Sequence, residues 1–182
     1  MTIRTYNNIH PQLGKNVYID STALVIGDVR LGDDVSIWPM TVLRGDVNSI
    51  EVGAKSNIQD GCVLHVTHKS DSNPAGHPVI VGQGVTVGHR VVLHGCTIGD
   101  LCLIGMGAVL MDGAVLEDRV MLAAGALVPP GKRLESGFLY IGSPAKAVRP
   151  LKDSELEFLE FSKEGYVSLK NQHLRDLGIR ID

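Results

Sequence analysis

A strict six-residue period in the aliphatic residues constrains this chain more than any other feature. Long aliphatic side chains stand at every sixth position in blocks separated by short interruptions. The blocks are Ile19, Val25, Leu31, Ile37 and Leu43; Val52, Ile58 and Leu64; Val81, Val87 and Leu93; and Ile98, Ile104, Leu110, Leu116, Leu122 and Val128. Small or β-branched residues such as Ala23 and Ala108 follow four positions later, and glycine often takes the second place, as in Gly32. Neither the 3.6-residue period of a helix nor the two-residue period of an ordinary strand predicts this spacing.

A period of six predicts a parallel β-helix, in which each hexad forms one short strand and a corner, and three hexads close a triangular coil. The long aliphatic residue fills the interior, the small residue fits the corner, and glycine tolerates the turn. The stacked coils then form a triangular prism. This pattern resembles the left-handed β-helix of hexapeptide-repeat proteins, so we expect an all-β solenoid. The 21 glycines, 44% hydrophobic residues and only 4% aromatic residues suit such repeated tight turns.

Three interruptions break the period, and interruptions of a regular scaffold often carry function. Residues 49–51 are an insertion, a longer loop leaves the prism after Leu64 and returns by Val81, and the Leu93 hexad is one residue short. We expect the longer loop to protrude without changing the order of the faces.

The end of the period divides the chain into two expected parts. We expect the hexads to stop at Pro129 and Pro130. Residues 1–150 are then a β-helix domain with an N-terminal segment and an exit strand. Residues 151–182 are a C-terminal α-helix and tail that pack on the prism.

The sequence predicts both ends of this C-terminal helix. Ser154 with Glu157 makes a capping box at its start, and Gly178 suits its end. An apolar stripe to be buried on the prism or on a neighbouring subunit is formed by Leu156, Leu159, Tyr166, Leu169 and Leu174.

Charge and composition exclude several classes of function. The net charge is -3, the isoelectric point is near 6.1, and no stripe of Lys and Arg stands out, so we expect no nucleic-acid partner. No run of 18 apolar residues is present, so we expect no membrane span, and the N-terminus lacks a secretory apolar segment. Cys62, Cys96 and Cys102 are odd in number and lack CxxC spacing, which predicts buried thiols in a cytoplasmic protein.

A count of hexads assigns residues to the three faces of the prism. We name the faces first, second and third from the hexads that begin at Leu43, Val52 and Ile58. Treating the long loop as a protrusion, Leu64 and Leu93 return to the first face.

This count predicts that several chemically active side chains stack. Arg44, His65 and His94 share one position of the first face in successive coils, and Asp60 and His89 share a position of the third face. Bonds from zinc to imidazole nitrogen are about 2.0–2.1 Å, so ligands one strand apart can converge on one ion. We therefore predict a metal site at His65 and His94. His89 lies across the prism wall, and one chain is not expected to complete the site.

A threefold assembly completes it. If the first face of one subunit meets the third face of the next, His89 of the partner subunit lies beside His65 and His94. The same contact sets Arg44 against Asp60 of the partner subunit. We predict a homotrimer whose metal site is shared between subunits.

These residues closely resemble the γ-class carbonic anhydrase family. The similarity covers nearly the whole chain, and its clearest motifs are Arg44-Gly45-Asp46, Asn57-Ile58-Gln59-Asp60-Gly61, Leu64-His65, Val87-Gly88-His89 and Leu93-His94-Gly95-Cys96. The most similar subgroup contains bacterial proteins variously described as carbonic anhydrase-like, hexapeptide transferase or ferripyochelin-binding.

The resemblance implies a cofactor and a reaction. The cofactor is zinc, with ferrous iron or cobalt(II) as alternatives, held by His65 and His94 of one subunit and His89 of the next. The reaction is reversible hydration of carbon dioxide to bicarbonate by a zinc-bound hydroxide, which is a lyase activity.

The resemblance also implies roles for residues around the metal. It places Gln59 near the metal-bound solvent and Arg44, Asp46 and Asp60 in ion pairs that order the interface and the site.

The residues for proton transfer depart from the family pattern. Active members carry a glutamate just after the Arg-Gly-Asp stretch, where this chain has Val47. The resemblance also implies an acidic loop beyond the first histidine for proton transfer, and here that loop offers Asp71 as its acid. His68 can serve as the proton shuttle instead, because the ordinary pKa of histidine is near 6.5. We therefore predict slow hydration.

Two other functions compete with this prediction. Many left-handed β-helix trimers are acyltransferases or acyl-CoA thioesterases, which need a basic residue in an intersubunit cleft but no convergent histidines. A non-enzymatic metal-binding or assembly protein is the third candidate, because the acidic proton shuttle is missing.

Overall fold

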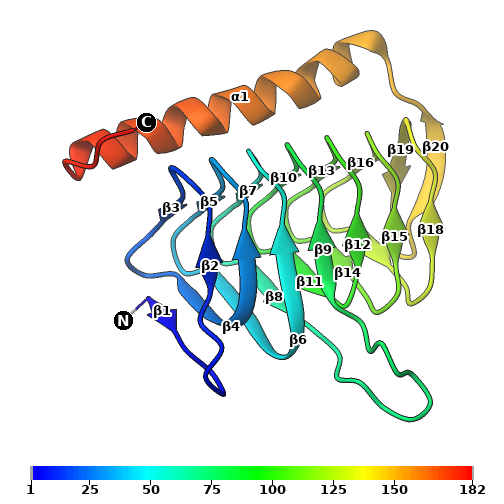
Figure 1. The fold of residues 1–182 in the computed structure, drawn as a ribbon. Coiled ribbons are helices and arrows are strands. Elements are labelled where there is room, and N and C mark those ends of the chain that lie inside the picture. The colour runs from blue at the N-terminus through cyan, green and yellow to red at the C-terminus, as the bar shows by residue number, and fades with distance from the viewer. Residues whose placement is uncertain (1, 182) are drawn as a thin grey trace.

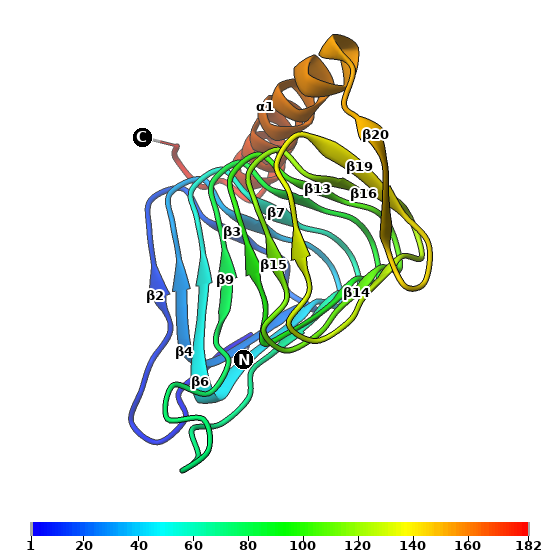
Figure 2. The same cartoon turned by 90° about the vertical axis from the view of Figure 1, so that its right-hand side faces the viewer.

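Very short strands joined by tight corners wind into a triangular parallel solenoid, in the computed structural model that describes residues 2–181 (Figures 1 and 2). The elements are β1 (Ile3–Arg4), β2 (Gln12–Leu13), β3 (Tyr18–Ile19), β4 (Leu24–Leu31), β5 (Ser36–Ile37), β6 (Val42–Val52), β7 (Asn57–Ile58), β8 (Val63–His65), β9 (Val79–Val81), β10 (Thr86–Val87), β11 (Val92–His94), β12 (Thr97–Ile98), β13 (Leu103–Ile104), β14 (Val109–Leu110), β15 (Val115–Leu116), β16 (Met121–Leu122), β17 (Leu127–Val128), β18 (Arg133–Leu134), β19 (Phe138–Ile141), β20 (Lys146–Pro150) and α1 (Asp153–Asp176). The predicted left-handed β-helix with a C-terminal helix is confirmed.

The strand pairing follows the predicted faces. The first face contains β8, β11, β14 and β17, the second contains β9, β12, β15 and β18, and the third runs from β3 through β5, β7, β10, β13 and β16 to β19 and β20. The long strands β4 and β6 bend from the first face into the second. All pairs are parallel except β19 with β20. The insertion at residues 49–51 lies within β6, and the loop between β8 and β9 protrudes from the prism (Figure 1).

The interior of the prism is filled by the aliphatic residues of the period. Leu64, Leu93 and Ile104 are completely buried, and the same cluster runs from Ala23 to Ala145. Burying one such side chain contributes about 1.5–3 kcal/mol relative to leaving it exposed. Because every coil adds its own buried residues, the core extends along the prism and fixes the register of the faces.

The predicted stop at Pro129 and Pro130 is wrong. The period continues through Leu134 and Tyr140, both buried, in β18 and β19, which pair with β15 and β16. The two prolines fall between β17 and β18, at a corner where proline removes no hydrogen bond of the ladder. The solenoid therefore tolerates at its corners a residue that would end a strand.

The predicted start of the C-terminal helix is also wrong, by two residues. The helix is capped at Lys152, whose backbone N–H donates to the Glu155 carboxylate at 2.8 Å. Arg149, in β20, holds the same carboxylate with two hydrogen bonds of 2.6 and 2.7 Å. This contact with the preceding strand, and not the Ser154–Glu157 pair, sets where the helix begins.

The helix α1 runs back along the prism and packs on β3, β5 and β10 of the third face (Figure 1). Leu159 and Leu174 of the predicted stripe are buried, but Leu169 is 39% exposed. Lys170 is buried in its place, and its amino group contacts the Asp34 carboxylate at 2.7 Å. A buried cation with a carboxylate partner therefore fixes the helix beside the apolar contacts.

The three cysteines are buried, as the sequence predicts. All three cysteines are free and buried, and burial raises the pKa of Cys62 to about 11 and of Cys96 and Cys102 to about 12. They are thus protonated packing groups at neutral pH. Within residues 2–181, no helix has both the length and the apolarity needed to cross a bilayer.

Candidate metal centre

Two histidines lie against each other at the ends of neighbouring strands of the first face. The strand register pairs Arg44 with His65 and His65 with His94, as predicted. The Nδ1 atom of His65 lies 3.2 Å from the Nε2 atom of His94. The folded chain therefore brings together two of the three predicted metal ligands.

Each of these rings has a carboxylate on its far side. Nε2 of His65 lies 3.1 Å from Oδ1 of Asp46, and Nδ1 of His94 lies 2.7 Å from Oδ1 of Asp112. A neutral imidazole has one N–H, and an ionised carboxylate only accepts. When both rings are neutral, their N–H groups point outward to the carboxylates. The inner nitrogens then face each other with a lone pair each.

A cation bound by both inner nitrogens would remove the repulsion between their two lone pairs. Two nitrogen ligands of one tetrahedral zinc, with bonds of about 2.0–2.1 Å, lie about 3.3 Å apart. The observed 3.2 Å separation fits this geometry. Ligand histidines usually donate their other N–H to a carboxylate, as both rings do here. The residues present therefore fit a zinc ion that still needs further ligands.

Both carboxylates are held in the ionised form. Burial raises the pKa of Asp46, but hydrogen bonds from Arg44 and His65 outweigh it and keep that pKa below the ordinary value. Burial likewise raises the pKa of Asp112, and hydrogen bonds from His94 and Thr67 outweigh it. Ionised partners keep the N–H of each ring pointing away from the other ring.

Sequence reasoning missed Asp112 and Thr67. Asp112 stacks on Gly95 in the next coil, and the Thr67 hydroxyl donates to its second oxygen at 2.8 Å. The signal was present in the hexad count, because Asp112 stands two residues after Leu110, which pairs with Leu93. Asp112 therefore lies one coil along from His94 and one residue further on.

The third predicted ligand lies on a different face. His89 follows β10 on the third face, its side chain is 47% exposed, and its Nδ1 lies 2.9 Å from Oδ2 of Asp60. In the described part of the chain, residues 2–181, no group of three or more His, Cys, Asp and Glu side chains is arranged to hold a metal. One chain thus carries the pair His65–His94 and, separately, His89.

The other predicted residues divide between these two places. Gln59 is buried next to His89, and its side-chain N–H donates to Asn57 Oδ1 at 3.1 Å. The guanidinium of Arg44 donates to Asp46 at 2.5 Å within the same chain. Asp60 contacts His89, as described above, so in one chain its carboxylate orients a histidine.

His68 lies in the protruding loop between β8 and β9 and is exposed. Asn48 fixes this loop, because its side-chain N–H groups donate to the carbonyl oxygens of Thr67 at 3.1 Å and Ala75 at 2.9 Å. These hydrogen bonds hold the loop against β6, which pairs with β8, the strand that contains His65.

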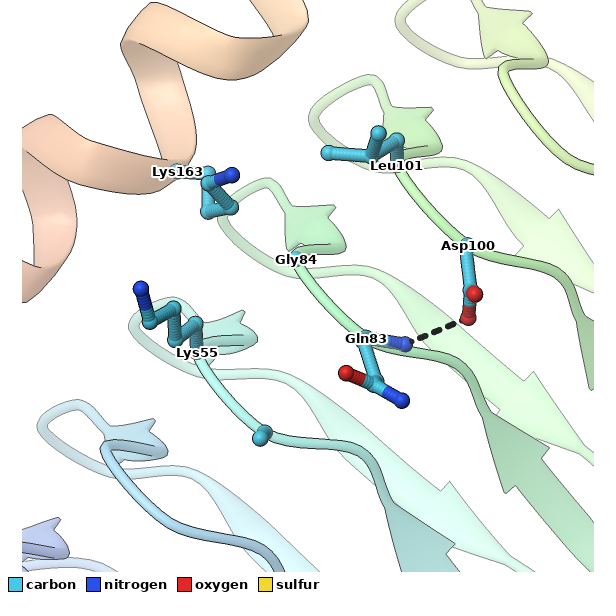
Figure 3. Close-up of a pocket in the computed structure, with 7 residues that line it drawn as sticks. Lys55, Gln83, Gly84, Asp100, Leu101 and Lys163 are labelled. Atoms are coloured by element: carbon cyan, nitrogen blue, oxygen red, sulfur yellow. Dashed lines mark hydrogen bonds between the residues drawn. The ribbon is translucent and has the colours of Figure 1, made fainter.

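A separate hollow of about 310 Å³ lies where α1 crosses the corners of successive coils (Figure 3). Lys55 and Lys163 lie on either side of it, and Glu164 contacts Lys163 at 3.3 Å and Lys55 at 3.7 Å. The Asp100 carboxylate accepts from the backbone N–H of Gln83 at 2.8 Å. Glu164 thus pairs with both lysines, and Asp100 is held by the backbone. The hollow lies at the contact between the helix and the prism and is not a candidate for the metal.

Comparisons with known proteins agree with this fold. Residues 10–45 match the bacterial transferase hexapeptide (six repeats), and residues 78–112 and 96–129 match the hexapeptide repeat of succinyl-transferase. The chain is 57% identical over 172 residues to the protein YrdA of Escherichia coli, covering 94% of each chain. It is 46% identical over 173 residues to the mitochondrial gamma carbonic anhydrase 1 of Arabidopsis thaliana, covering 93% of this chain and 62% of that protein.

A solved structure is similar as well. The hexapeptide transferase family protein of Anaplasma phagocytophilum has a TM-score of 0.88 and 41% identity, covering 95% of this chain and 98% of that one. The chain belongs to the γ-carbonic anhydrase-like family of hexapeptide-repeat proteins, as its motifs indicated.

Proposed function

We propose that this protein is a homotrimeric, zinc-dependent enzyme of the γ-carbonic anhydrase type that hydrates carbon dioxide reversibly. The observation that carries the proposal is the pair of inner nitrogens of His65 and His94, 3.2 Å apart with a carboxylate behind each ring. Kinship with the gamma carbonic anhydrase of Arabidopsis supports the reaction. The three free, buried thiols support a cytoplasmic location.

The proposed ligands are His65 and His94 of one subunit and His89 of the partner subunit. Asp60 contacts Nδ1 of His89 as Asp46 and Asp112 contact the outer nitrogens of the other two rings. All three rings thus keep one nitrogen free for a metal. Zinc held by these three rings would supply a bound water with a pKa of about 7 and would polarise a substrate oxygen.

Further residues act on the substrate and on the proton. Gln59, held by Asn57, presents an amide beside His89 that can donate a hydrogen bond to an oxygen of carbon dioxide or bicarbonate. Arg44 keeps Asp46 ionised and so keeps His65 oriented. His68, exposed in the loop next to Thr67, is placed to pass a proton to buffer.

Metal analysis followed by stopped-flow hydration of carbon dioxide tests the proposal. We expect about one zinc per chain and measurable hydration in the wild type, with both lost in His65→Ala, His89→Ala and His94→Ala. His10→Ala, at an exposed histidine on the N-terminal segment, is the control and keeps both. A purified protein that retains no divalent metal contradicts the proposal.

An acyl-transfer function is the second candidate, favoured by the description of the Anaplasma relative as a hexapeptide transferase family protein. The same measurements separate the two functions. A protein that is fully loaded with zinc and hydrates no carbon dioxide at any buffer concentration favours acyl transfer.

A further inference from the structure

The helix α1 does not close completely on the third face. A cavity of about 270 Å³ remains between the helix and the strands β10 and β13, and His89 lies at its edge. Its walls are mainly apolar, with Leu103 and Met106 from the prism and Phe158 from the helix. Met106 is 58% exposed and Phe158 is 48% exposed, so these apolar side chains border an open space.

The polar groups of the cavity lie together near His89. Gln59 and Tyr166 line this part, and Gln59 is only 5% exposed. The Tyr166 hydroxyl is a donor at neutral pH, because the ordinary pKa of tyrosine is near 10. Burial and the Asp60 carboxylate raise that pKa further, and they outweigh the side-chain contact with Gln59, which lowers it. Elsewhere in the cavity the Thr86 and Ser162 hydroxyls share one hydrogen bond of 2.8 Å, and Thr86 also accepts from the Asn57 amide at 3.1 Å. These hydroxyls already have polar partners, so Gln59 and Tyr166 at the His89 end are the groups best placed to donate to a ligand.

The size of the cavity exceeds what carbon dioxide needs. A cavity of about 150 Å³ holds benzene in another protein, and the cavity here is about 270 Å³. Carbon dioxide has half the heavy atoms of benzene and would leave most of the space to water against apolar walls. Apolar walls with a few polar groups at one end are typical of small-molecule sites.

We propose that this cavity binds a neutral carbonyl compound that carries a ring-sized apolar group, such as an aromatic amide or ester. The ring lies among Leu103, Met106 and Phe158, and the carbonyl oxygen accepts from Gln59 or Tyr166. The negative carboxylate of Asp60, 2.9 Å from His89, favours a neutral ligand over a carboxylate. One chain supplies all the lining residues, but in the proposed trimer the His89 end of the cavity faces the partner subunit, so the nearness of the carbonyl to a metal rests on the proposed function.

Binding of benzamide to the zinc-free protein tests the proposal without any enzyme assay. We expect saturable binding in ligand-observed NMR or calorimetry, with acetamide and benzoate each at least about tenfold weaker. Phe158→Ala removes one wall and weakens benzamide at least about threefold, as expected for an aromatic contact. Leu177→Ala is the control, because Leu177 caps the C-terminal end of the same helix, is 66% exposed and is outside the cavity lining.

A second variant distinguishes loss of the cavity from loss of the fold. Ala124→Leu, at the exposed rim, fills the cavity and should abolish benzamide binding while the circular dichroism spectrum stays unchanged. Equal affinity for benzamide and acetamide, or equal effects of Phe158→Ala and Leu177→Ala, overturns the proposal. Zinc content is measured on each preparation before the metal is removed, so loss of the metal site and loss of the cavity ligand are told apart.

Discussion

Asp46, Asp60 and Asp112 each accept a hydrogen bond from one candidate ligand histidine, at 2.7 to 3.1 Å. Asp112 is the best test of this arrangement, because its second oxygen is fixed by Thr67. The hexad count places Asp112 one coil along from His94, and the structure shows that their side chains meet. The contact to His94 joins two coils at a corner, where the hexad count gives the neighbouring coil but not the direction of the side chains.

Asp112→Asn should weaken zinc binding about 10- to 100-fold, as loss of an outer carboxylate usually does. The amide can present an N–H to the His94 ring and no longer holds the ring N–H outward. Chelator competition measures the change in zinc affinity. Asp71→Asn, at an exposed acid in the protruding loop, is the control and should match the wild type. Unchanged affinity in Asp112→Asn would show that the carboxylate does not orient His94.

Proton removal should limit turnover, because Val47 stands where a glutamate shuttle is expected and His68 is exposed. Raising the concentration of imidazole buffer should raise kcat with little change in kcat/KM, since kcat/KM reports steps up to bicarbonate formation. His68→Ala should deepen this dependence on buffer, and Val47→Glu should relieve part of it. Stopped-flow hydration measures all three. A kcat that is independent of buffer in the wild type and in His68→Ala would refute the shuttle role.

At the level of elements, the period predicted the faces because every hexad adds one strand and one corner. The protruding loop did not shift the faces, since Leu64 and Leu93 pair directly. Two predictions failed because they considered the local sequence without its contacts in the folded chain. The predicted stop at Pro129 is wrong because this residue falls at a corner, and the predicted helix start is wrong because the start depends on Arg149 in β20.

The contact between Arg149 and Glu155 joins β20 to α1 and should make stability depend on pH. Two hydrogen bonds from Arg149, helped by the Lys152 N–H, lower the pKa of Glu155 from 4.5 to about 2. A lowered pKa means that the folded state favours the ionised form, so this stabilisation is present above about pH 4.5 and is lost as the pH falls toward 2.

Glu155→Gln should therefore lower the free energy of unfolding at pH 7, and its difference from the wild type should shrink below about pH 4.5. Urea denaturation at a series of pH values measures this. Glu157→Gln, on the exposed side of the same helix, is the control and should differ little from the wild type at any pH. A Glu155→Gln difference of the same size at pH 7 and pH 3 would mean that the contact does not depend on the charge.

On the scale of the whole molecule, the candidate site is split between two faces of one prism. His65 and His94 lie on the first face and His89 on the third, and the faces can be followed around the solenoid in Figure 2. The hexad count predicted this separation, and the sequence could not show how two copies dock. The two parts complement each other, because the His65–His94 pair needs a further metal ligand and, in our proposal, His89 of the partner subunit supplies it.

The central claim, that neighbouring subunits share each metal, is tested most directly by co-expressing His89→Ala with His65→Ala and counting the zinc in purified mixed trimers. Any mixed trimer contains one interface where His65 and His94 of one chain meet His89 of the partner subunit. The account therefore predicts one zinc per mixed trimer, with none in a trimer of either variant alone and three in the wild type. Mixed trimers that hold no more zinc than the single-variant trimers would contradict the shared site.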